Sequence, residues 1–216
     1  MASKKKLTIL VSSTVYGIEE LLDRIYALLT AYGYEVWMSH KGTMPVSSDK
    51  TAFNNCLDAV EKCDLFLGLI TPQYGSGQDP DDSAKMSITH QEIIRALELN
   101  KPRWILAHDH VVFARSLLNN LGYKGKKGRA KLHLKKTKVF EDLRVLDLYE
   151  DATLDKEPPD SIPPVERAGN WAQKFNTSDD AAVFVMAQFF RYQDVEAFIK
   201  ENFKGGNPLE GKGTRS

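Results

Sequence analysis

Strand-like and helix-like segments alternate through the first half of this chain. Short apolar runs typical of buried strands occupy residues 7–13, 34–40, 64–71 and 102–109. Between them, as in 17–33, apolar residues recur at helical spacing. Such a rhythm requires right-handed crossovers and a parallel sheet. The sequence therefore predicts an α/β fold, with an open parallel sheet of about five strands and helices on both faces.

The second half of the chain has a less regular pattern. The segment VLDLYE (145–150) fits a fifth strand, so we expect the α/β domain to span residues 1–150. Residues 151–177 are proline-rich and acidic, which is typical of an excursion from the domain. A long helical pattern at 178–203 predicts a C-terminal helix packing on the same domain, and residues 204–216 have the composition of a disordered tail.

Composition excludes several classes of protein. The chain has 216 residues, enough for one domain, and its 29 basic and 29 acidic residues balance. The apolar runs are too short to span a membrane, and the N-terminus predicts a strand rather than a signal peptide, so we expect a cytoplasmic protein. The basic stretch 123–138 has few aromatic residues, which favours a solvated insertion over a nucleic-acid site. Cys56 and Cys63 are interpreted as reduced core residues.

Hydroxyl, imidazole and carboxyl groups follow the predicted strands. Because ligands bind beyond the carboxyl ends of parallel strands, these groups are candidates for a ligand site. The candidates are Ser12, Ser13, Thr14, His40, Thr71, Tyr74, Ser87, Thr89, Glu92 and His108. The sequence has no G-x-G-x-x-G after the first strand and no P-loop, so the standard dinucleotide fingerprints are absent.

Glu92 admits two interpretations. Thr89 lies three residues before it, so T-H-Q-E fits a capping box that stabilises the start of a helix. The same glutamate follows a buried strand and fits a catalytic carboxylate facing a ligand. His108 and His110 share a strand face, but no third ligand is spaced to join them, so no metal site is expected.

Three stretches together resemble a bacterial family, domain of unknown function 4062. They are ILVSST at the first strand, CDLFLGLITPQYGSG at the third strand, and SITHQEIIRALELNKPRWIL after it. The resemblance covers roughly residues 5–110. This family is related to Toll/interleukin-1 receptor (TIR) domains and to nucleoside 2-deoxyribosyltransferases, which implies a flavodoxin-like, Rossmann-like sheet.

The resemblance also implies a chemistry. In both enzyme groups, a glutamate that opens the helix after the third strand cleaves an N-glycosidic bond, and Glu92 occupies that place. Ser12 and Ser13 would bind ribose or phosphate, Tyr74 would contact the base or sugar, and His40 or His108 would assist the leaving group. The transferases also carry an aspartate near the ribose in the loop before the glutamate. Asp79, Asp81 and Asp82 lie in that loop here, and the motif does not single out one of them.

Two functions remain open at this stage. One is an NADase-like hydrolase or a ribosyltransferase that acts on NAD or a nucleoside, with the nucleotide as substrate and no separate cofactor. The other is a non-catalytic module for nucleotide sensing or protein assembly, as in bacterial defence signalling. For the second, the expected partners are further copies of the chain or an operon-encoded protein. Nucleic-acid binding through 124–138 is the weakest alternative.

Overall fold

The sheet has five parallel strands in the order β2-β1-β3-β4-β5. The computed structural model describes residues 5–75, 85–132, 139–140, 142–153 and 171–203. The strands are β1 (Thr8–Ser13), β2 (Glu35–Trp37), β3 (Leu65–Ile70), β4 (Arg103–His108) and β5 (Ala172–Phe175). This order is the flavodoxin-like one, and it changes direction between β1 and β3. The predicted fold class is therefore confirmed.

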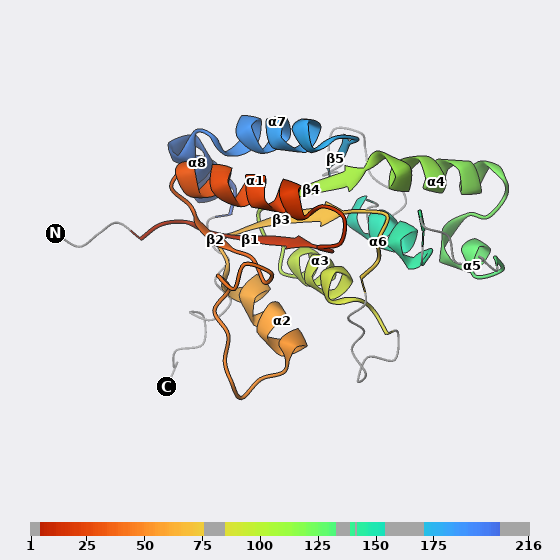
Figure 1. Cartoon of the computed structure of the whole chain (residues 1–216), viewed down its shortest axis with the longest axis horizontal. Coiled ribbons are helices and arrows are strands. Elements are labelled where there is room, and N and C mark those ends of the chain that lie inside the picture. Colours follow the sequence, from red (N-terminus) through yellow and green to blue (C-terminus); the bar gives the residue numbers. More distant parts are fainter. Residues whose placement is uncertain (1–4, 76–84, 133–138, 141, 154–170, 204–216) are drawn as a thin grey trace, which may run out of the picture.

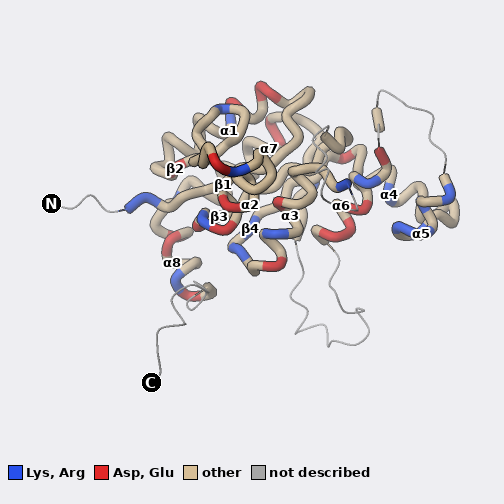
Figure 2. The backbone as a smooth tube through the Cα atoms, turned by 90° about the horizontal axis from the view of Figure 1, so that it is seen from below, with Lys and Arg blue, Asp and Glu red and all other residues tan. Residues whose placement is uncertain are grey.

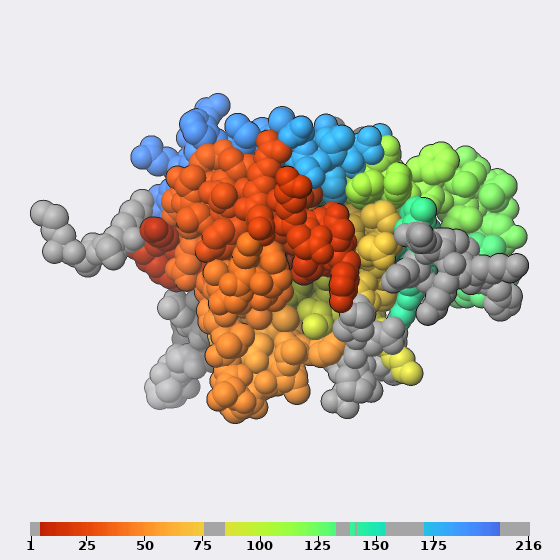
Figure 3. Space-filling model, in the orientation of Figure 1, coloured from red at the N-terminus to blue at the C-terminus, as the bar shows by residue number. Residues whose placement is uncertain are grey.

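Helices cover both faces of the sheet (Figure 1). On one face, α1 and α7 lie side by side, with α8 next to them, and Figure 3 also places the blue C-terminal helices beside the red N-terminal part. On the other face lie α2, α3 and α6. The helices are α1 (Glu19–Ala31), α2 (Ala52–Lys62), α3 (Ile88–Glu98), α4 (Asp109–Asn120), α5 (Gly125–Arg129), α6 (Arg144–Thr153), α7 (Ser178–Phe189) and α8 (Tyr192–Asn202).

The prediction of a strand at 145–150 is wrong, because these residues belong to helix α6. Val145, Leu148 and Ala152 are buried at helical spacing against the sheet. The fifth strand is β5, so the sheet extends beyond residue 150 into the segment 151–177 predicted as an excursion. Residues 154–170 of that segment, like the predicted tail, lie outside the described residues.

The predicted C-terminal helix is divided into two helices, α7 and α8. Arg191 has non-helical torsion angles between them, and this break lets α8 turn back onto the sheet. There the Tyr192 hydroxyl accepts a hydrogen bond from the Leu7 amide at 2.7 Å, and its ring lies 4.9 Å from that of Tyr34. These contacts of Tyr192 attach the last described helix to the N-terminal part of the chain.

Part of the basic stretch pairs with acids of the same chain. Arg129 is buried and donates from Nε to Asp147 at 2.9 Å and from Nη1 to Glu150 at 3.1 Å. Lys126 pairs with Asp151 at 2.8 Å. Figure 2 shows the blue residues of α5 near the red residues of α6. These two basic side chains therefore have a structural role, while residues 133–138 lie outside the described part.

Candidate functional site

A cavity of about 370 Å³ opens at the carboxyl ends of β1 and β3, where the strand order changes direction. The end of β1 and the start of α3 supply polar side chains to its lining. The segment that follows β1 forms another part of the wall, together with Ser39, Met44 and Gly75. It brings together six of the ten candidates: Ser12, Ser13, Thr14, Ser87, Thr89 and Glu92. Topology explains this convergence, because ligand crevices in such sheets form at the switch point.

Glu92 lies at the base of this cavity and is only 5% exposed. The Ser12 hydroxyl donates to its Oε2 at 2.5 Å, across 80 residues of sequence. Burial raises the pKa of Glu92 to about 7, while hydrogen bonds from Ser12 and Cys56 oppose that rise. Glu92 is therefore a buried carboxyl group that titrates near neutral pH and is held in place from β1 and α2.

The capping-box interpretation of Thr89 and Glu92 is wrong. The N-cap of α3 is Ser87, whose side chain accepts a hydrogen bond from the His90 amide at 3.3 Å. Thr89 lies inside the helix, and Glu92 lies past its first turn, hydrogen-bonded to Ser12 of β1. Because Ser87 caps the helix, Glu92 is not needed as a capping residue, and capping does not explain why it is buried.

The backbone beside the cavity approaches the end of β1 closely. Gly75 has a φ of +93°, and a Cβ at this position would lie 3.3 Å from Oγ1 of Thr14. Glycine is therefore favoured here both by its torsion angle and by the contact. Ser13 donates its hydroxyl to the Thr14 carbonyl at 3.0 Å, so the segment after β1 is locally fixed.

Four candidates lie outside the cavity lining. Tyr74 is buried, and its hydroxyl lies 2.6 Å from Nδ1 of His90. Nε2 of His90 lies 3.3 Å from Asp151, so the three side chains form a chain of polar groups. Thr71 accepts from the Gln73 amide at 3.3 Å. Nε2 of His40 lies 3.6 Å from the Asp23 carboxylate. His108 is the N-cap of α4, and its side chain accepts a hydrogen bond from the backbone amide of His110. These four side chains are therefore not part of the cavity lining, and their contact with a ligand stays a prediction.

Three residues that contact Glu92 or line its cavity were not predicted as site residues from the sequence. Cys56 is buried on α2, and its thiol hydrogen-bonds to Glu92. Its position on the apolar face of a helix gave no sign of a polar contact. Glu19, in the first turn of α1, and Tyr16, 65% exposed, also line the cavity, and their place just after the first strand was the available signal.

A cluster of metal ligands and a membrane-spanning helix are both absent from the described residues. Within the described ranges, no group of three or more histidine, cysteine, aspartate or glutamate side chains could hold a metal ion. None of the helices in this part of the chain has both the length and the apolar composition that crossing a membrane requires. The loop aspartates between Gly75 and Lys85 fall outside the described residues.

Two solved structures are similar to this chain. One shows the TIR domains of the activated Roq1 resistosome that recognises the pathogen effector XopQ, with 14% identity over 88% of this chain and 99% of that one, at a TM-score of 0.47. The other is a 2-deoxyribosyltransferase from Bacillus psychrosaccharolyticus, with 20% identity over 46% of this chain and 72% of that one, at a TM-score of 0.30.

The family itself is assigned by sequence. No protein with a curated description matches the chain. The model of the family described as a domain of unknown function, DUF4062, matches residues 8–157, more than half of the chain. This range includes β1 to β4 and the residues that line the cavity. The chain therefore belongs to the DUF4062 family.

Proposed function

We propose that this protein binds the ribosyl part of a nucleoside or nucleotide in the switch-point cavity and cleaves or transfers its N-glycosidic bond. Glu92 is the catalytic carboxylate in this proposal. The observation that carries it is the position of Glu92, buried at the base of a hydroxyl-lined cavity and hydrogen-bonded to Ser12. Perturbed carboxyl groups in crevices are typical of catalytic sites.

The chemistry fits a single carboxylate. As the bond between the sugar carbon and the base nitrogen breaks, its electron pair leaves with the base, and positive charge develops on the sugar. An ionised Glu92 stabilises that charge or traps it as an ester, and water or an acceptor then forms the new bond. Ser12, Ser13 and Thr14 line the cavity, and in this proposal their hydroxyls hydrogen-bond with sugar hydroxyls.

The charged residues of the cavity lining limit which part of a substrate can bind there. Glu19 and Glu92 contribute two carboxyl groups, and the described lining includes no lysine or arginine. An acidic cavity repels phosphate and favours neutral or cationic groups. We therefore expect the sugar and a neutral or cationic base, such as nicotinamide, to occupy the cavity, with any phosphate groups outside it.

The test is chromatography of NAD, NADP, ATP, nicotinamide riboside and deoxynucleosides incubated with the protein. The wild type is expected to convert one of these compounds to a free base, and Glu92→Gln is expected to lose that conversion. The matched control is Glu98→Gln, on the same helix, because Glu98 is exposed and, within the described part of the chain, forms an ion pair with Arg95 at the surface. Turnover that survives Glu92→Gln, or that Glu98→Gln abolishes equally, would contradict the proposal.

A non-catalytic nucleotide-sensing or assembly module is the second candidate. It is favoured by the engagement of Glu92 with both Ser12 and Cys56, since a carboxyl group held from two sides is less free to attack a sugar. Under this alternative, calorimetry would detect nucleoside binding to the wild type and to Glu92→Gln, while no base would be released by either protein.

A further inference from the structure

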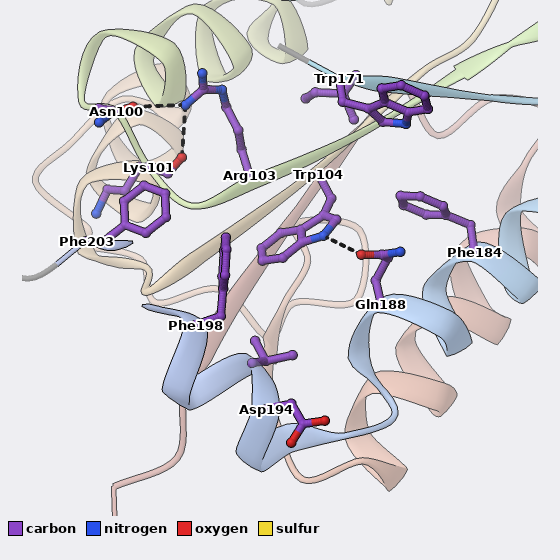
Figure 4. Close-up of a pocket in the computed structure, with 12 residues that line it drawn as sticks. Asn100, Lys101, Arg103, Trp104, Trp171, Phe184, Gln188, Asp194, Phe198 and Phe203 are labelled. Atoms are coloured by element: carbon purple, nitrogen blue, oxygen red, sulfur yellow. Dashed lines mark hydrogen bonds between the residues drawn. The ribbon is translucent and has the colours of Figure 1, made fainter. Parts of the chain in front are cut away.

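A second and larger cavity, of about 580 Å³, lies at the opposite edge of the sheet, where β4 and β5 begin (Figure 4). The start of β4, Trp171 just before β5, and helices α7 and α8 form its walls. It shares no lining residue with the cavity around Glu92. Its volume falls in the range of about 300–1,000 Å³ that small-molecule sites occupy.

Aromatic rings form much of the wall of this second cavity. Trp104 lies with its ring centroid 4.8 Å from that of the buried Phe189 and 6.4 Å from that of Phe198, so its position is fixed by packing. Trp171 is 75% exposed, and Phe198 is 45% exposed. Figure 4 shows Trp104, Trp171, Phe184 and Phe198 among the residues that line the cavity. Exposed rings around a cavity present faces on which a planar ligand can stack.

Polar groups in the wall are oriented by neighbouring residues. The Trp104 indole donates from Nε1 to Oε1 of Gln188 at 3.1 Å, so the Gln188 amide nitrogen points away from Trp104 (Figure 4). Arg103 donates from Nη1 to Oδ1 of Asn100 at 3.3 Å and to the Lys101 carbonyl at 3.1 Å. These bonds hold the guanidinium group at the cavity wall.

The charge of the lining is the reverse of that around Glu92. Lys101 and Arg103 are cationic, and Asp194 is the acidic residue among the lining residues. Asp194 pairs with Arg191 at 3.3 Å, so its charge is partly compensated outside the cavity. A wall that combines aromatic rings with a guanidinium group matches a planar ligand that carries a negative charge.

We propose that this second cavity binds a planar aromatic anion of small-molecule size. The ring of the ligand lies against Trp104 and Trp171, and its acid group lies beside Arg103. The Gln188 amide supplies a further donor. This site is separate from the proposed N-glycosidic chemistry, and neither proposal depends on the other.

Calorimetric titration of the full chain with 2-naphthoate tests this site, with the neutral 2-naphthamide as its uncharged counterpart. We expect 2-naphthoate to bind at least about tenfold more tightly than 2-naphthamide. Trp171→Ala and Arg103→Gln should each weaken 2-naphthoate binding by about tenfold or more, and Arg103→Lys should restore part of the preference for the anion. Phe113→Ala is the control, because Phe113 is 65% exposed on α4, outside the cavity.

Three results would overturn the proposal. The first is the absence of 2-naphthoate binding to the wild type. The second is binding that Phe113→Ala weakens as much as Trp171→Ala does, which would indicate non-specific adsorption. The third is a self-associated protein in analytical ultracentrifugation that Trp171→Ala dissociates, since the cavity would then be a contact between copies of the chain. Thermal unfolding of each variant verifies that it is folded.

Discussion

At the scale of single residues, Glu92 combines burial with a charge that appears near neutral pH. Its pKa of about 7 means that the folded protein keeps a proton that the unfolded chain releases near 4.5. Between these values the unfolded state binds fewer protons, so stability falls as the pH rises from about 4.5 to about 7 and is level above that. The total loss is about 3 kcal/mol at most.

Glu92→Gln should remove this loss. Glutamine stays neutral at every pH, and its amide can keep the hydrogen bond with Ser12. We expect the variant to be about as stable as the wild type near pH 4.5 and more stable by up to about 3 kcal/mol above pH 7. Urea unfolding across this range measures the difference. A variant that is less stable than the wild type at pH 8 would show that Glu92 supports the fold through its charge.

Ser12→Ala should move the pH dependence of turnover. The Ser12 hydroxyl lowers the pKa of Glu92 by donating to the ionised form, so its removal raises that pKa further. We expect the midpoint of the rise of kcat/KM with pH to move to higher pH, with Ser13→Ala as the control because Ser13 bonds to a backbone carbonyl. An unchanged midpoint in Ser12→Ala would mean that Glu92 does not govern the rate.

The sequence alone placed Ser12 and Glu92 at the same edge of the sheet, because strand order and the carboxyl-end rule are enough for that. It did not reveal the direct bond between them, since side chains 80 residues apart carry no local sign of contact. It also missed Cys56, whose thiol looks like any small apolar group on the buried face of a helix.

At the scale of elements, the start of α3 decides how Glu92 is presented. Ser87 caps this helix through the His90 amide, and Thr89, the second residue of the helix, lines the cavity. Ser87→Ala should therefore destabilise the protein by about 1 kcal/mol, and Thr89→Ala should cost less because Thr89 does not cap the helix. Chemical denaturation of the two variants compares them. A larger loss of stability in Thr89→Ala than in Ser87→Ala would support the capping-box interpretation instead.

Two elements were predicted wrongly for physical reasons. VLDLYE contains apolar residues in both alternating and helical positions, and burial of Val145, Leu148 and Ala152 on one face selects the helix. The true fifth strand, AQKF, has one fully buried residue and depends on β4 for its hydrogen bonds. A short edge strand of this kind leaves almost no pattern in its own sequence. By contrast, β1 and β3 were correctly located, because their nearly continuous apolar runs are typical of strands covered on both faces.

At the scale of the whole molecule, an ion network joins α4, α5 and α6. Arg115 and Arg129 both bond to Glu150, and Arg129 also bonds to Asp147. The Arg129 side chain is 2% exposed, so its loss leaves buried acids with fewer partners. This network attaches the basic stretch to the same body as the sheet.

Arg129→Met should destabilise the protein by about 3 kcal/mol. Lys126→Met, which removes the more exposed pair with Asp151, should cost less than about 1 kcal/mol. Urea unfolding of both variants measures the two losses in the free energy of unfolding. The comparison is valid where the slope of that free energy against urea concentration is the same as in the wild type. Equal small effects would mean that the network is not part of the folded core.

The burial of Glu92 has a consequence for any attempt to engineer this chain. A screen that rewards heat resistance alone favours replacement of a costly buried acid, and so favours proteins that have lost the proposed chemistry. Variants recovered from such a screen would purify well, resist proteolysis and be inactive. Useful improvement of this protein therefore requires selection for turnover at every round.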